Sequence, residues 1–184
     1  MTSMSACCGG DDTGRALVAG TLRGYRSWLP VRRKGLASGA LPLASVQIPG
    51  VVWTKTLHAR CFAPAFSDTT QTSEPSAPHG PPERGCRCGI YAWYRPDDIV
   101  LMHAPVFGVI AASGVIMMGT RGFRAQQADI VAVVTHKRGI AAACEQAGVA
   151  VYRRRRHLLH DFPTEDLTVL LDDSPTGEPA CPDP

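Results

Sequence analysis

The sequence predicts a β-rich α+β fold, either a bent antiparallel sheet or a partly open small barrel, with one helix near the C-terminus. Two observations favour this fold class. The 184 residues include 18 glycines and 15 prolines, which favour short strands and turns over long helices. Only residues 136–148 (HKRGIAAACEQAG) have a convincing helical pattern, and Gly148 ends it in the usual C-terminal glycine position.

The strands of the first half are expected in two groups. Residues 15–31 form a strand or a strand pair, because apolar positions alternate before Pro30. Residues 35–64 form two more short strands around the turn at Pro49–Gly50.

The second half continues this pattern. Residues 88–94 (CGIYAWY) have the composition of a strand, and residues 104–135 read as three strands or as two long bent ones. After the helix, residues 149–156 (VAVYRRRR) add a strand, and residues 162–171 add a short helical or strand segment.

A chain of this length is expected to form one domain. We assign residues 15–171 to this β-rich domain. Residues 66–85 interrupt it as an irregular loop, because Ser, Thr, Pro and Gly predominate there and little apolar surface can be buried. Residues 1–14 and the acidic, proline-rich residues 172–184 are expected to be disordered tails.

Charge and cysteine content restrict the compartment and the partners. The net charge of +3 is too small to draw the whole protein onto nucleic acid or anionic membrane. The first residues (MTSMSACCGGDD) lack the basic and apolar regions of a secretory signal. Seven cysteines without an export signal predict a reducing, cytoplasmic location.

Residues 99–120 carry no charge and are long enough to span a bilayer. His103, Pro105, three spaced glycines and many β-branched residues in this segment suit buried strands at least as well. We therefore expect no membrane partner.

Four soft ligands fall in the middle of the chain with the spacing Cys-x17-His-x6-Cys-x-Cys; they are Cys61, His79, Cys86 and Cys88. Three thiolates and one imidazole are a ligand set of closed structural zinc sites. Alternate residues of an extended strand have Cα atoms about 6.6 Å apart. The last two cysteines must therefore lean together or lie on a turn, which Gly85 and Gly89 permit. Zinc is the expected cofactor.

Other readings of these residues stay open. Cys86 or Cys88 could be a catalytic thiol activated by His79, with nearby arginines lowering the thiol pKa, although the sequence marks no orienting residue or oxyanion hole. The cysteines could also have no special chemistry. A metal bound at both ends of the irregular loop would offset the entropy lost when that loop is ordered, which favours the zinc site.

Two short segments, RGYRSW (23–28) and RGFRAQ (121–126), each place an aromatic residue between two arginines. Such pairs can stack bases and hold phosphates, or they can be strand ends with the aromatic residue in the core and the arginines in water. The candidate ligand-binding residues are Arg23, Tyr25, Arg26, Trp28, Arg121, Phe123 and Arg124.

These pieces together resemble a family of small bacterial proteins, largely actinobacterial, whose activity is uncharacterised. The resemblance runs through GYRSW, ARC, HGPPERGCRCGIYA and VFGVIAASGVIMMGTRGFRAQQADIVAVV, or roughly residues 22–134. It implies that the three cysteines and the histidine belong to one recurring motif. The chain departs from the family pattern at Ala112, Ser113, Gly114 and Met118, and at Phe123, where a tyrosine is usual.

The sequence favours a non-enzymatic binding module that is stabilised by structural zinc and binds nucleic acid, a small ligand or another protein. One alternative is a cysteine-dependent enzyme that uses Cys86 or Cys88 with His79. A metal-free protein-interaction adaptor is another.

Overall fold

The structure is a computed structural model that describes residues 16–17, 20–32, 34–48, 50–61, 79–99 and 104–165. The predicted tails at 1–14 and 172–184, and residues 66–78 of the predicted irregular loop, lie outside the described residues.

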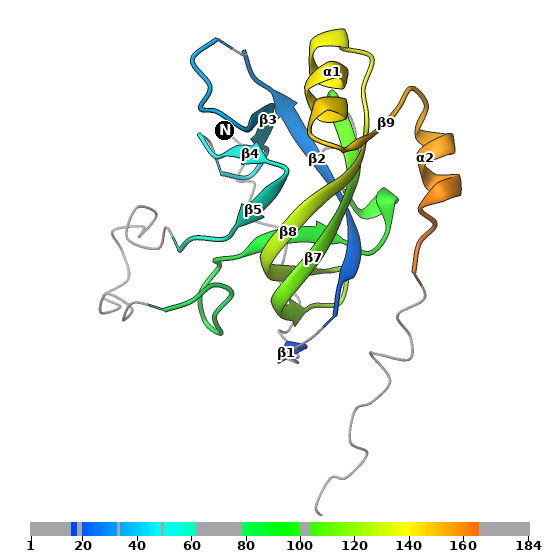
Figure 1. Cartoon of the computed structure of the whole chain (residues 1–184). Coiled ribbons are helices and arrows are strands. Elements are labelled where there is room, and N and C mark those ends of the chain that lie inside the picture. Colours follow the sequence, from blue (N-terminus) through cyan, green and yellow to red (C-terminus); the bar gives the residue numbers. More distant parts are fainter. Residues whose placement is uncertain are drawn as a thin grey trace, which may run out of the picture.

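The described chain is β-rich with two short helices near its C-terminal end (Figure 1). The strands are β1 (Ala16–Leu17), β2 (Leu22–Pro30), β3 (Ala40–Ser45), β4 (Val52–Thr54), β5 (Thr56–His58), β6 (Ile90–Trp93), β7 (Val106–Met118), β8 (Gly122–Val134) and β9 (Ala150–Tyr152). The helices are α1 (Arg138–Gln146) and α2 (Arg155–Asp161), and a 3-10 turn, η2 (Pro96–Asp98), follows β6.

Four strands pair in a closed ring, because β7 pairs with β8, β8 with β6, β6 with β2, and β2 with β7. The main hydrophobic core draws buried side chains from all four of these strands. Gly24 of β2 is needed there, since a Cβ at this position would lie 2.7 Å from both the Ala92 Cβ and the Phe123 ring. The predicted β-rich fold with a bent, partly closed sheet is confirmed.

Strand β8 pairs with four other strands. One of its edges pairs with β7 along most of its length, and the other edge is shared by β6, β5 and β9 in turn. Ile90 at the start of β6 lies opposite Ala125, and His58 at the end of β5 lies opposite Gln127. The end of β5 and the start of β6 therefore meet at the same point of β8. Strand β9 runs parallel to β8, so the sheet is mixed and not purely antiparallel.

The predicted helix near the C-terminus is α1, and in the described residues a second helix, α2, follows it. Helix α1 packs against β3 and β9, and α2 packs against β8 and β9 (Figure 1). The strand predicted over residues 149–156 is shorter in the structure, since β9 ends at Tyr152. The arginine run 153–156, typical of a solvated face or a helix start, leads into α2, which begins at Arg155. The fully buried Leu158 anchors α2 in a second core cluster with Tyr25 and other side chains.

The uncharged segment 99–120 is largely β7, whose residues pair with β2 and β8. Residues 104–135 thus form two long strands, the second of the two predicted arrangements. The register between β7 and β8 shifts at two points. In the described ranges, neither α1 nor α2 has the length and apolar character needed to cross a bilayer.

Candidate metal centre

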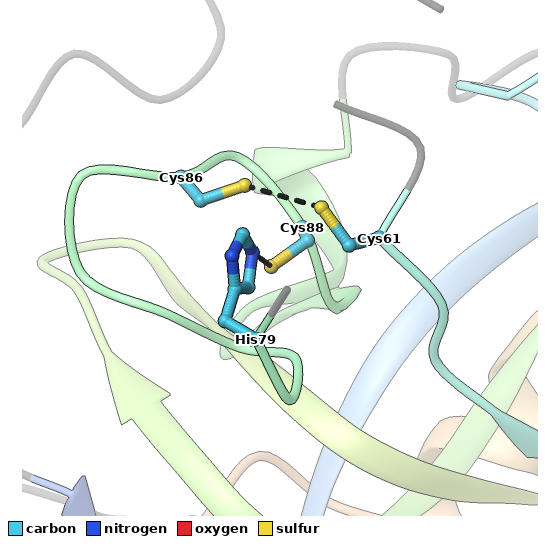
Figure 2. A group of neighbouring side chains, drawn as sticks. All are labelled: Cys61, His79, Cys86 and Cys88. Carbon is cyan, nitrogen blue, oxygen red and sulfur yellow. Dashed lines mark hydrogen bonds between the residues drawn. The ribbon is translucent and has the colours of Figure 1, made fainter. Parts of the chain in front are cut away.

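The structure brings Cys61, His79, Cys86 and Cys88 together in one cluster, here called the metal centre (Figure 2). Cys61 comes three residues after β5, where the Ala59 N–H still donates to the Gln126 carbonyl of β8 at 2.8 Å. The other three come from the ligand loop, residues 79–89, which leads into β6. Because β5 and β6 meet along one edge of β8, residues far apart in sequence converge there.

The distances in the metal centre fit tetrahedral coordination. The four ligand atoms all lie within 4.8 Å of one another. The Cys61 and Cys86 Sγ atoms are 3.6 Å apart, and the Cys88 Sγ lies 3.4 Å from the His79 Nε2. Two sulfurs bound to one tetrahedral zinc would be about 3.8 Å apart, and a sulfur and an imidazole nitrogen about 3.5 Å. Figure 2 shows all four side chains pointing into the same space.

The ligand loop turns sharply, as the Cys-x-Cys spacing requires. The Cys86 N–H donates to the Glu83 carbonyl at 3.2 Å, and Gly85 and Gly89 both have positive φ. Gly89 is also a point of close approach, because a Cβ there would lie 3.1 Å from the Arg124 Cβ. The two glycines therefore let the two cysteines of the loop face one ligand position, which confirms the turn that the sequence predicts.

A buried arginine holds the ligand loop on β8. Arg124 is only 8% exposed. Its guanidinium donates to the Cys86 carbonyl and, at 3.2 Å, to the Cys88 carbonyl. It also lies over the Tyr91 ring, with 6.0 Å between the guanidinium carbon and the ring centroid. Hydrogen bonds from a charged donor are among the stronger ones, so Arg124 fixes the backbone on both sides of Arg87.

The thiols of the metal centre differ in acidity. Burial raises the pKa of Cys88, and its hydrogen bond to Cys86 adds to this, so that the pKa reaches about 12. Burial acts in the same direction on Cys86, but hydrogen bonds from Cys88, Cys61 and His79 outweigh it and lower the pKa to about 7. A bound cation would deprotonate coordinating thiols outright, which makes a metal the natural partner of this set.

A catalytic thiol would have to be Cys86 and not Cys88. His79 lies 3.4 Å from the Sγ of Cys88, a buried thiol with a raised pKa, whereas a nucleophile needs an accessible thiolate; His79 also contributes a hydrogen bond that lowers the pKa of Cys86. Cys86 has the lower pKa, but its thiol lies 3.6 Å from the Cys61 thiol, inside the cluster.

The predicted ligand-binding residues do not gather on one exposed face. Tyr25, Trp28 and Phe123 are buried at 4%, 0% and 3% exposure. Tyr25 stacks on Phe107 and donates to the Phe162 carbonyl at 2.8 Å. The aromatic residues of the two motifs are therefore core residues.

The four arginines of these motifs have different surroundings. Arg23 forms an ion pair with Glu165. Arg121 forms an ion pair with Asp98 at 3.0 Å, and its guanidinium lies over the Trp93 ring. Arg124 binds the ligand loop, and Arg26 lies over Trp53. A shared role of all seven residues in binding a ligand stays a prediction.

The sequence did not reveal the structural role of Arg124. Its place in the motif RGFRAQ suggested a phosphate contact, and only the pairing of Tyr91 with Arg124 in β6 and β8 puts it beneath the ligand loop. Its signal in the sequence is the alternation of β8, where an arginine falls among apolar positions.

Comparison with models of protein families, with curated proteins and with solved structures found no match to this chain. The resemblance to the actinobacterial family therefore stays a prediction, and the metal centre is interpreted from its own geometry.

Proposed function

We propose that the protein is a non-enzymatic binding module whose fold is stabilised by a structural zinc ion at the metal centre. One observation carries this proposal: three sulfurs and one imidazole nitrogen lie within 4.8 Å of one another. This donor set matches that of structural zinc sites, in which four protein ligands complete the coordination and leave no position for a substrate.

A structural role also follows from where the ligands lie. Cys61 and Cys86 are 25 positions apart in the sequence, yet their thiols lie 3.6 Å apart in the metal centre. A metal that joins its two ends removes conformational freedom from the unfolded chain, as any cross-link that closes a long loop does. It also ties the end of β5 to the start of β6, which pair with β8 but not with each other.

Cobalt titration tests this proposal directly. Co²⁺ added to metal-free protein should give the visible absorption bands of tetrahedral cobalt and the ultraviolet band of cobalt–thiolate bonds, and an equivalent of Zn²⁺ should remove them. Cys61→Ser should lose most of both bands, because a closed site needs all four ligands. Cys144→Ala is the matched control, since Cys144 is a buried cysteine outside the metal centre. Protein that folds without binding either metal would refute the proposal.

The alternative, a cysteine-dependent enzyme, makes the opposite prediction for alkylation. A nucleophilic Cys86 or Cys88 would react with iodoacetamide in the folded, zinc-treated protein and leave the fold intact. The structural zinc site predicts instead that zinc protects all three cysteines and that a chelator exposes them together. Peptide mass spectrometry of alkylated protein separates the two.

Nucleic acid was also predicted as a partner, and Arg121 is the motif arginine best placed for it, because 58% of its side chain is exposed. Retention on single-stranded nucleic acid that falls steeply with salt, and falls less steeply in Arg121→Met, would support this partner.

A further inference from the structure

A groove of about 450 Å³ lies beside the metal centre, between β2 and β6 on one side and the β4–β5 region on the other. A volume of this order accommodates a small organic molecule.

Arg26 is the most unusual residue of this groove, because in the described part of the chain it is a buried cation without a counter-charge. The residue is 8% exposed, and among the described residues no carboxylate pairs with it. Its guanidinium donates to the Tyr91 carbonyl and, at 2.9 Å, to the Ser45 Oγ. The buried Nε has no hydrogen-bond partner within the described ranges. Burial lowers the pKa of Arg26 to about 10, so the side chain is still charged at neutral pH.

The rest of the groove does not supply the missing charge. Its described lining contains three basic side chains, Arg26, His58 and Arg60, and no Asp or Glu. Since buried charges in proteins are normally paired, an uncompensated guanidinium that lines a groove indicates that the counter-charge comes from a ligand. The planar fork of arginine suits a carboxylate or a phosphate.

The walls of the groove indicate the rest of the ligand. Ile48, Val51, Leu57 and Ile90 provide apolar surface, and the Trp53 indole packs under the Arg26 guanidinium at 5.0 Å. The Trp53 Nε1 is buried and finds no hydrogen-bond partner among the residues that the structure describes. Apolar walls with a few polar groups at one point are typical of sites that bind an apolar body and orient it by its polar end.

We infer that this groove binds a small organic anion, with a carboxylate or phosphate group held by Arg26 and an apolar or aromatic body against the walls next to Trp53. The inference rests on the proposed binding function and names the class of ligand. The exposed Arg60 also lines the groove, and its positive charge attracts the anion.

The groove and the metal centre share their framework. Arg60 precedes the ligand Cys61, and Gly89 follows the ligand Cys88, so the metal centre fixes two lining segments of the groove. The Tyr91 carbonyl that accepts from Arg26 belongs to β6, the strand that the ligand loop enters. Loss of metal should therefore weaken anion binding as well as stability.

The test is isothermal titration of zinc-loaded protein with four probes: indole-3-acetate, its neutral amide, indolyl phosphate and inorganic phosphate. We expect indole-3-acetate or indolyl phosphate to bind at least tenfold more tightly than the amide. If indole-3-acetate binds more tightly, the ligand is a carboxylate. If indolyl phosphate binds more tightly, the ligand is a phosphate. If neither indolyl anion binds more tightly than the amide, or if neither binds at millimolar concentration, the inference is overturned.

Variants locate the site. Arg26→Met should weaken binding of the preferred indolyl anion by tenfold or more, and Trp53→Phe and Arg60→Met by threefold or more. Arg32→Met is the matched control, since Arg32 is exposed and does not line the groove. If Arg26→Met fails to fold, the Arg60→Met and Trp53→Phe variants carry the test. Unchanged binding in all folded groove variants would place the anion elsewhere and refute the inference.

Metal binding is measured on the same protein samples, so the two proposals can fail separately. Anion binding by a protein that takes up no cobalt or zinc would refute the structural metal and retain the groove. Stoichiometric metal with no binding of either indolyl anion would retain the metal and refute the groove.

Discussion

Replacing Arg124 by methionine tests whether this buried side chain holds the metal centre together. Methionine keeps the apolar stem of the side chain but removes the charged donors. The Cys86 and Cys88 carbonyls, which receive hydrogen bonds from Arg124, then lose them at the point where the ligand loop must turn.

The expected loss has two parts. A hydrogen bond to a charged group contributes about 1.5–3 kcal/mol, so two of them correspond to about 3–6 kcal/mol, less the relief of no longer burying a guanidinium. We expect a net loss of about 2–4 kcal/mol in the free energy of unfolding. Partners that orient metal ligands typically contribute a factor of about 10–100 to metal affinity, and we expect Arg124→Met to lose zinc by this factor.

The assay is competition with a chromogenic zinc chelator, combined with urea unfolding of the zinc-loaded and metal-free protein. Arg121→Met is the matched control. Arg121 lies three residues earlier, but its side chain is 58% exposed and its ion pair with Asp98 is on the surface. Surface ion pairs contribute about 0–1 kcal/mol, so this control should change stability little and zinc affinity not at all.

A result in which Arg124→Met and Arg121→Met have the same zinc affinity would refute the assigned role of Arg124. A loss of stability equal in zinc-loaded and metal-free protein would show that Arg124 supports the sheet and not the metal centre.

Three further predictions concern the core. Gly24→Ala should destabilise the protein by about 1–3 kcal/mol in urea unfolding, because the added Cβ would lie 2.7 Å from the Phe123 ring; an unchanged midpoint would contradict the packing inside the strand ring. Tyr25→Phe should cost about 1 kcal/mol in the same assay, since it removes the hydrogen bond to the Phe162 carbonyl, and wild-type stability would argue against this contact. Cys144 has a pKa raised to about 11, first by burial and then by Glu145, so its folded form keeps a proton that the unfolded chain releases. Its contribution to stability is therefore present below pH 9 and is lost as the pH rises to 11, by at most about 1.4 kcal/mol per pH unit. Unfolding measured at pH 8 and pH 11 should show a smaller decline in Cys144→Ala, and equal declines would contradict the assignment.

The fold class could be predicted from the sequence because strand signals are local. Alternating apolar residues mark β2, β-branched and aromatic residues between turn residues mark β6, β7 and β8, and Gly148 lies just after the helix at 138–146. Helix α2 could not be predicted in this way. It is seven residues long, begins inside a run of four arginines and depends on a single buried anchor, Leu158. Tertiary packing, and not a periodic pattern, fixes such a helix.

The ligands of the metal centre could be predicted because the residue types are chemically rare and few other cysteines compete for the role. The sequence could not give their distances, which arise from the meeting of β5 and β6 on β8. The groove could not be predicted either. Arg26 stands in the sequence beside Tyr25, and its burial over Trp53 follows only from the pairing of β2 with β3 and of β3 with β4.

The central claim is tested most directly by the metal content of protein purified without a histidine tag, measured by elemental mass spectrometry. The structural site predicts about one zinc per chain in the wild type and in Cys144→Ala, and a near-complete loss in Cys61→Ser, because a closed site needs all four ligands. Folded wild-type protein that contains no metal, or a Cys61→Ser variant that keeps the full amount, would contradict it.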